Sequence, residues 1–264
     1  MLTDITIGQY IDADSIIHRL DPRIKIISTL IAIIALFLIS SFIGFALYLA
    51  LVLTIIFVSR ISPTRILKGL KPIFFLMIIT FVFHAFLTEG GTVLWEWRFL
   101  RIEEEGLFRG AFMVTRIILL IMFTSLLTLT TSPLDLTDGI EYLLNPFRRI
   151  GVPSGELAMM MTIALRFIPT LLNEADKIIK AQKSRGADFE SGNIIRRAKN
   201  LVPLLVPLFI SAFRRADDLA LAMESRCYQG GQKRSRLHVL KMEARDSWAV
   251  TIMVLFSVLV AVFF

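Results

Sequence analysis

Long apolar runs, separated by short charged segments, dominate the hydrophobic pattern of this chain. A helix needs about 20 mostly apolar residues to cross the hydrocarbon core of a bilayer, with roughly 17 tolerated. Five runs meet or approach that length, and they cover residues 24–40, 42–58, 72–87, 107–129 and 248–264. Only Ser40 and Ser41 divide the first two, which predicts a tight helical hairpin. The pattern therefore predicts an all-α, polytopic membrane protein with about five transmembrane helices.

Two further apolar runs, at residues 157–172 and 201–213, differ from these five because polar or helix-breaking residues interrupt them. Arg166 and Pro169 interrupt the first of them, and two prolines interrupt the second. Apolar runs of about 10 to 14 residues are more often buried or interfacial than spanning. We therefore predict that both form helices at the membrane surface or against partner helices.

The connections between the five long runs carry opposite charges. Residues 59–71 hold two arginines and two lysines, whereas the acidic connection at residues 89–105 ends on three consecutive glutamates. The positive-inside rule places the basic connection in the cytoplasm and the acidic one outside. It follows that the amino terminus is cytoplasmic. The long basic segment at residues 130–246 is then expected on the cytoplasmic side as well.

These assignments divide the chain into three parts. Residues 1–132 are expected to form an amino-terminal membrane part with four spans, and residues 133–246 to form cytoplasmic or interfacial amphipathic helices. Residues 247–264 are expected to form a carboxy-terminal transmembrane helix.

Composition supports the membrane assignment. Hydrophobic residues make up 55% of the chain, and 21 of its 264 residues are phenylalanine. A soluble domain has only about 45–50% apolar residues. The net charge of +7 is explained by membrane topology and a basic docking surface, so it does not call for nucleic acid. The one cysteine, Cys227, excludes an internal disulfide and a cysteine-based metal cluster.

One sequence element occurs twice in the basic segment. Residues 175–185 and 216–226 both begin with Ala-Asp, have alanine in the middle and end with Ser-Arg. Apolar residues between these points fall at helical spacing, which predicts two helices that each finish on an arginine. A chain that offers one element twice suits a partner with one socket twice, such as a two-fold or pseudo-two-fold dimer.

Two explanations compete for Arg185 and Arg226. A cation in the last helical turn stabilises a helix by about 0.3–1 kcal/mol through the helix dipole, and Gly186 would provide a left-handed stop. Alternatively, both arginines dock onto a partner, because a guanidinium can bind a carboxylate through two parallel hydrogen bonds. The exact register of the two copies favours docking over helix capping alone.

Motifs for catalysis or cofactor binding do not occur in the sequence. It contains no phosphate-binding loop, no His-Glu-x-x-His and no Gly-x-Ser-x-Gly. His84 is expected to be a packed or interfacial histidine, since no metal-type spacing surrounds it. Arg116 lies inside the fourth apolar run, where a charge is a candidate functional residue. Snorkelling to the surface or pairing within the helix bundle explains it equally well.

Several segments together resemble the transmembrane T component of energy-coupling factor (ECF) transporters, over about residue 8 to the last span. They are residues 8–10 (GQY), 15–23 (SIIHRLDPR), 164–170 (ALRFIPT), 181–189 (AQKSRGADF), 202–209 (VPLLVPLF) and 222–226 (AMESR). The resemblance implies two crossed cytoplasmic coupling helices, each ending in a short motif whose arginine docks into a groove on one of a pair of ABC-type ATPases. By position these motifs are Ser184, Arg185, Gly186 and Ser225, Arg226, Cys227. Cys227 departs from the glycine or small residue common there.

The resemblance also implies the partners and the mechanism. A separate substrate-binding S component would be held by the membrane helices, and the ATPases, a homodimer or heterodimer, would bind ATP and Mg²⁺. The chain itself would hold no cofactor and catalyse no reaction. It would pass the ATP-driven motion to the S component, which tips over to release a vitamin inside the cell. The expected location is the cytoplasmic membrane of a prokaryote.

Contacts with the S component are expected where soft or aromatic side chains cluster. An unbranched, polarizable methionine repacks at little cost, which suits a surface that accepts different partners. The candidates are Met159, Met160, Met161, Phe74 and Phe75. Ordinary core packing explains any single methionine equally well.

Two other classes of protein compete with the coupling subunit. A self-contained secondary transporter would show inverted repeats and paired intramembrane charges, whereas the repeat here is direct and cytoplasmic. A membrane enzyme would need convergent acid, base or metal groups near one interface. The solute is not encoded in this chain, because its identity belongs to the S component. Similarity to the T component of shared modules favours water-soluble vitamins over cobalt or nickel.

Overall fold

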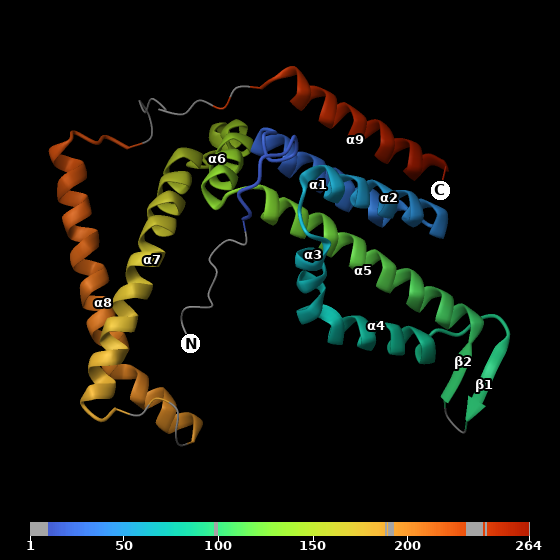
Figure 1. The fold of residues 1–264 in the computed structure, drawn as a ribbon, viewed down its shortest axis with the longest axis horizontal. Coiled ribbons are helices and arrows are strands. Elements are labelled where there is room, and N and C mark those ends of the chain that lie inside the picture. Colours follow the sequence, from blue (N-terminus) through green and yellow to red (C-terminus); the bar gives the residue numbers. More distant parts are fainter. Residues whose placement is uncertain are drawn as a thin grey trace. The chain divides into compact units, whose positions relative to one another are not determined.

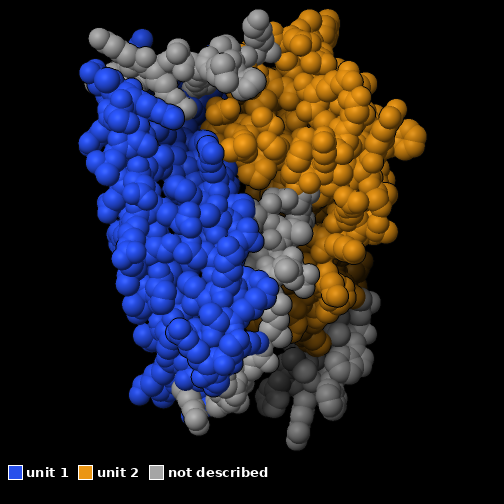
Figure 2. Space-filling view, turned by 60° about the vertical axis from the view of Figure 1, so that its left-hand side comes forward, with its two compact units in different colours: residues 1–7, 140–239 blue, residues 8–139, 240–264 orange. Residues whose placement is uncertain are grey.

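Helices form most of the part of the chain that the computed structural model describes, which comprises residues 10–97, 100–187, 189, 193–230, 240 and 242–263 (Figure 1). Of the segments quoted for the family resemblance, Gly8, Gln9 and Asp188 lie outside the described residues, as does Phe264 of the last apolar run. The chain divides into two compact units, coloured separately in Figure 2. Unit 1 comprises residues 1–7 and 140–239, and unit 2 comprises residues 8–139 and 240–264.

Unit 2 contains most of the apolar helices. Its elements are α1 (Pro22–Leu38), α2 (Phe42–Ser59), α3 (Pro63–Leu70), the 3-10 turn η1 (Lys71–Ile73), α4 (Phe74–Leu87), β1 (Val93–Trp97), β2 (Leu100–Glu103), α5 (Glu104–Thr130) and α9 (Ala244–Phe263). Helix α6 (Pro133–Leu144) spans the boundary between the units. Unit 1 continues with the 3-10 turn η2 (Asn145–Ile150), α7 (Ser154–Ser184) and α8 (Ile194–Ser225).

Five helical stretches in the described residues are long and apolar enough to cross a membrane, in agreement with the predicted all-α membrane fold. Four coincide with predicted runs: α2, the continuous stretch Pro63–Leu87, α5 and α9. The fifth is α7, which the sequence analysis placed at the membrane surface. Helix α1, predicted as a span, has 17 residues and is not among the five.

The prolines that interrupt the apolar runs of unit 1 do not end its helices. Helix α7 runs for 31 residues through Pro169, and α8 runs for 32 residues through Pro203 and Pro207. A proline inside a helix removes one backbone hydrogen bond and crowds the preceding turn, at a cost of about 3 kcal/mol. The turns on either side keep their own bonds, so this cost does not end the helix. Each apolar run therefore continues into the helix that carries an arginine repeat.

The two connections of opposite charge also contain elements that the pattern did not predict. The basic connection includes α3, which joins through η1 to α4. The acidic connection includes the antiparallel hairpin of β1 and β2, in which Val93 pairs with Glu103. Hairpin formation uses backbone pairing, which a count of apolar residues does not detect. The fold is therefore helical with one short β-hairpin in the described residues.

The core of unit 2 forms where α1, α2, α5 and α9 pack together. Tyr48 of α2 is fully buried in this core, and its hydroxyl donates to Ser257 Oγ of α9 across 2.7 Å. Because a buried hydroxyl needs a partner, this bond fixes where α2 meets α9. Helix α4 approaches α5 closely: a Cβ on Gly106 would lie 2.8 Å from the carbonyl oxygen of His84. Glycine is required there by backbone contact.

A buried carboxylate joins the beginning of α1 to the beginning of α9. Asp246 is only 2% exposed, and its Oδ1 accepts from the backbone N–H of Asp21 at 3.0 Å. Its Oδ2 accepts from the backbone N–H of Glu243 at 2.8 Å. Asp21 in turn caps α1, because its side chain accepts from the N–H of Arg23. Two residues 225 positions apart thereby hold the beginnings of α1 and α9 together.

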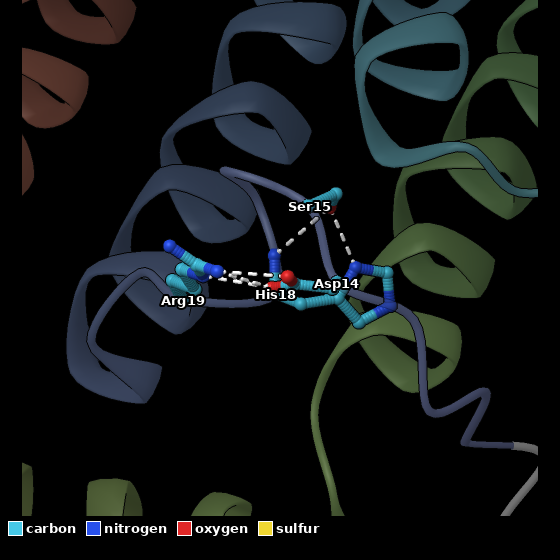
Figure 3. A network of polar contacts seen from close by, with 4 residues as sticks. All are labelled: Asp14, Ser15, His18 and Arg19. Atoms are coloured by element: carbon cyan, nitrogen blue, oxygen red, sulfur yellow. Dashed lines mark hydrogen bonds and ion pairs between the residues drawn. The ribbon is translucent and has the colours of Figure 1, made fainter.

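The segment before α1 carries a compact polar network (Figure 3). Ser15 Oγ lies 2.7 Å from His18 Nδ1 and accepts from the His18 backbone N–H at 3.3 Å. Arg19 donates from Nε and Nη2 to the two carboxylate oxygens of Asp14, each at 2.8 Å. Lys25 Nζ donates to the carbonyl oxygens of His18 and Thr130, at 3.0 and 2.8 Å. The segment is thus fixed to both α1 and the end of α5.

Candidate functional site

The first arginine repeat ends in a complete Schellman motif, a left-handed helix stop closed by two backbone hydrogen bonds. Arg185 is the C-cap residue of α7, and Gly186 follows it with φ of 85°. The N–H of Gly186 donates to the carbonyl of Lys183 at 3.0 Å, and that of Ala187 to the carbonyl of Gln182 at 2.9 Å. These bonds satisfy carbonyls that the helix end leaves open. The predicted left-handed stop at Gly186 is confirmed.

The second repeat ends in the same motif. The N–H of Cys227 donates to the carbonyl of Glu224 at 2.8 Å, and that of Tyr228 to the carbonyl of Met223 at 3.0 Å. Cys227 has φ of 56°, so it occupies the left-handed position that Gly186 occupies in the first copy. The end of α8 therefore follows the end of α7 bond for bond, even though glycine is replaced by cysteine.

The serine before each arginine turns its hydroxyl inward along the helix. Ser184 Oγ donates to the carbonyl of Lys180 at 3.0 Å, and Ser225 Oγ donates to the carbonyl of Ala222 at 2.9 Å. Small serine side chains bonded to their own helix leave the adjacent surface open. Arg185 and Arg226 are exposed, and in the described part of the chain neither guanidinium has an ion-pair or hydrogen-bond partner. Both cations are therefore available to a partner.

An ion pair connects the two helices that carry these ends. Nη2 of Arg215, on α8, lies 2.9 Å from Oε2 of Glu174, on α7. Their side chains are 42% and 24% exposed. The two helices pack against each other and cross in the view of Figure 1, where α7 is yellow and α8 orange. Sequence reasoning missed this pair because its partners are far apart along the chain, although both lie just before the Ala-Asp of a repeat.

The proposed S-component contacts are mostly exposed. Phe74 and Phe75, at the start of α4, are 61% and 72% exposed, while Met160 and Met161 of α7 are 57% and 41% exposed. Met159 is intermediate. Ordinary core packing, the other explanation for the methionines, does not hold for the exposed Met160 and Met161. Their role in binding a partner stays a prediction.

Arg116 of α5 packs within the helix bundle of unit 2. Its Nη2 donates to the carbonyl of Ile39 at 3.1 Å, at the end of α1. Its guanidinium carbon lies 5.1 to 5.8 Å from the ring centroids of three phenylalanines, Phe37, Phe45 and Phe112. A cation over aromatic rings is stabilised by their electron-rich faces. These contacts account for the intramembrane charge as a structural residue that holds the α1–α2 hairpin against α5.

The described residues give little support for a metal site or for a polar binding site. They contain no group of three or more His, Cys, Asp or Glu side chains placed to hold a metal ion. A cavity of about 260 Å³ in unit 2 lies between α1, α2, α5 and α9, and its lining is largely apolar. The polar groups at its edge, such as Lys25 and Thr130, are engaged with each other.

A family model and several known proteins match most of this chain. The family model described as "Cobalt transport protein" (CbiQ) matches residues 13–239. A protein of Clostridium kluyveri is 60% identical over 93% of this chain and 92% of its own length, and one of Thermosediminibacter oceani is 58% identical over 93% and 92%. A protein of Acidaminococcus fermentans is 51% identical over 99% and 97%. All three are named "Energy-coupling factor transporter transmembrane protein EcfT".

Proposed function

Because the chain belongs to the family of energy-coupling factor transporter transmembrane proteins, the T components of ECF transporters, we propose that it transmits motion from two ATPase subunits to a substrate-binding S component. The chain is a multi-pass membrane protein, with five candidate spans among its described residues. In this proposal it lies in the cytoplasmic membrane of a prokaryote with its amino terminus inside. Its partners bind ATP and Mg²⁺ and hydrolyse the nucleotide, while this chain catalyses no reaction.

The observation that carries the proposal is that the two helix ends have the same backbone structure. Two Schellman motifs with the same hydrogen bonds each present one exposed arginine, which has no ion-pair or hydrogen-bond partner among the described residues. Helix capping alone does not require an arginine at the same position twice. A pair of ATPase subunits related by a two-fold or pseudo-two-fold axis offers one groove twice, so the repeat matches the symmetry of that partner. A carboxylate in each groove would bind the guanidinium through two parallel bonds.

Transport then follows from mechanical linkage. ATP binding would close the ATPase dimer and shift the two grooves relative to each other, and the shift would move α7 and α8. The membrane helices would pass this movement to the S component, which would tip and release its solute. For the solute we propose water-soluble vitamins. The names of the relatives do not specify a solute, whereas the description of the family model names cobalt.

The arginine proposal is tested by substituting each arginine in the intact complex. Arg185→Ala and Arg226→Ala should each cost about 2–5 kcal/mol of ATPase binding, because truncation leaves a desolvated carboxylate unpaired on the partner. Loss of a solvated helix cap would cost less than about 1 kcal/mol. Lysine should restore binding poorly, since it keeps the charge but lacks the planar fork.

The readouts are co-purification of the two ATPases with the tagged chain and solute uptake by proteoliposomes. Arg214→Ala is the matched control, because Arg214 is an exposed arginine on α8 away from the helix end. The double variant should release the ATPases while the chain still inserts in the membrane. Wild-type recovery of both ATPases with intact uptake would refute the docking role and leave the arginines as helix caps.

A further inference from the structure

The ion pair between Glu174 and Arg215 joins equivalent positions of the two repeats. The repeats are offset by 41 residues, since Arg226 corresponds to Arg185, and 215 minus 174 is also 41. An operation that exchanges the two copies would exchange these two residues. Their contact therefore lies where a local two-fold axis between the copies would pass.

Identical residues would repel at such a position. Two glutamates or two arginines brought together would place like charges in contact, which destabilises the packing. The copies match at Ala175 and Ala216 and at Asp176 and Asp217, yet they differ in charge at the preceding residue. The change of sign turns the repulsion that symmetry would impose into an attraction, with Nη2 and Oε2 at 2.9 Å.

The pair is also equidistant from the two proposed docking arginines. Arg185 follows Glu174 by 11 residues, and Arg226 follows Arg215 by 11 residues. At about 1.5 Å per residue, each arginine lies roughly 16 Å along its helix from the pair. The contact therefore lies at the same distance along each helix from the docking arginine of that helix.

We propose that the Glu174–Arg215 pair is the tie through which α7 and α8 move as one coupled element, so that displacement of both docking ends produces transport rather than slippage between the helices. The proposal rests on the proposed function. Glu174 and Arg215 are positioning residues, because in this proposal they touch neither ATP nor solute. They keep the ends of α7 and α8 in a fixed position relative to each other. Nη2 of Arg215 makes this contact, while its Nε is shielded from solvent and has no hydrogen-bond partner in the described part of the chain. The side chain of Ser211, also on α8, hydrogen-bonds to Glu174 as well, so Glu174 is held by two residues of α8.

The test uses the complete complex of this chain, both ATPases and an S component, reconstituted in proteoliposomes. The variants are Glu174→Ala, Arg215→Ala and the exchange Glu174→Arg with Arg215→Glu. Solute uptake and ATP hydrolysis are measured together, and the ratio of solute transported to ATP hydrolysed is the decisive quantity. Lys180→Ala is the matched control, because it removes an ion pair of 2.7 Å with Asp176 that lies within α7 alone.

Each single variant should lower the transport ratio by about tenfold, the factor that corresponds to a coupling energy of about 1.4 kcal/mol. Both ATPases should still co-purify, because Arg185 and Arg226 are intact. The exchange should restore the ratio to within about twofold of wild type, since it recreates the attraction with the charges reversed. Lys180→Ala should behave as wild type.

Two results would overturn the tie. One is a wild-type ratio in both single variants, and the other is an exchange variant as defective as the single ones. If a single variant fails to assemble, recovery of assembly by the exchange supports the proposal and continued failure refutes it. Co-purification of the ATPases distinguishes loss of the tie from loss of arginine docking. The docking is tested separately by Arg185→Ala and Arg226→Ala, without use of the transport ratio.

Discussion

Cys227 adopts the left-handed backbone conformation of Gly186, its counterpart in the first repeat, with φ of 56° against 85°. Both residues donate the corresponding backbone hydrogen bond that closes a helix end. A residue with a Cβ pays about 1–2 kcal/mol for this conformation, whereas glycine adopts it freely. The second helix end therefore contains local strain that the first does not.

Replacing Cys227 by glycine should stabilise the protein. We expect Cys227→Gly to raise the free energy of unfolding by up to about 1 kcal/mol and to increase the Tm of the purified complex. Gly186→Ala is the reciprocal variant, and it should lower the Tm because it introduces the same strain into α7. A lower Tm for Cys227→Gly would mean that the thiol makes a stabilising contact in the assembled transporter.

Membrane topology can be tested by labelling single cysteines introduced into a Cys227→Ser background. Glu104 begins α5, and Lys183 lies in the last turn of α7; both residues are exposed. The positive-inside rule predicts that a cysteine at residue 104 reacts with an impermeant maleimide in intact cells and that one at residue 183 does not. The latter should react only after the cells are permeabilised. Labelling at residue 183 from outside would show that the docking ends lie on the outer side of the membrane, and it would contradict the predicted topology.

The methionines of α7 should contribute to retention of the S component. Replacing Met159, Met160 and Met161 together by valine removes flexible side chains that adapt to a partner surface. We expect less S component to co-purify with the tagged chain, while the ATPases remain at wild-type yield.

The control for this triple variant places valine on another span. Leu255 and Leu259 are exposed apolar residues of α9 without a branch at Cβ, and their double replacement by valine introduces β-branching on that helix. It should leave both partners bound. Equal loss of the S component and the ATPases in the methionine variant would indicate general misfolding and not a lost contact.

His18 should make the stability of unit 2 depend on pH. Burial lowers the pKa of its imidazole, and the nearby charge of Lys25 lowers the pKa further. The unfolded chain then binds a proton more readily than the folded one, so stability is retained above the unfolded pKa of about 6.5 and decreases as the pH falls below it. The Tm of the complex should therefore be lower at pH 5.5 than at pH 7.5.

Substitution of His18 isolates its contribution to this pH dependence. His18→Gln keeps a side chain able to hydrogen-bond with Ser15 but removes the titrating group. The difference in Tm between pH 7.5 and pH 5.5 should be smaller in this variant than in wild type. An unchanged difference would assign the acid sensitivity to other groups.

Local sequence accounts for the long apolar helices and for the two helix ends. Hydrophobic run length predicts α2, α5 and α9 closely because a membrane helix satisfies its own backbone hydrogen bonds, whatever surrounds it. The repeated Ser-Arg endings predict where α7 and α8 stop, because a Schellman motif involves only about six consecutive residues. Pro169, Pro203 and Pro207, which interrupt the apolar runs, lie inside continuous helices. The energy of the neighbouring turns, and not the proline alone, decides whether a helix ends.

Run length, charge asymmetry and the paired arginine endings were thus present in the sequence by itself, since each depends on residues close together along the chain. Only the tertiary structure decided which distant residues meet. It brought Arg215 to Glu174, placed the backbone of Asp21 against Asp246, and surrounded Arg116 with three phenylalanines. Such contacts depend on how helices pack in three dimensions, and helical periodicity specifies the face of a helix but not the partner that covers it.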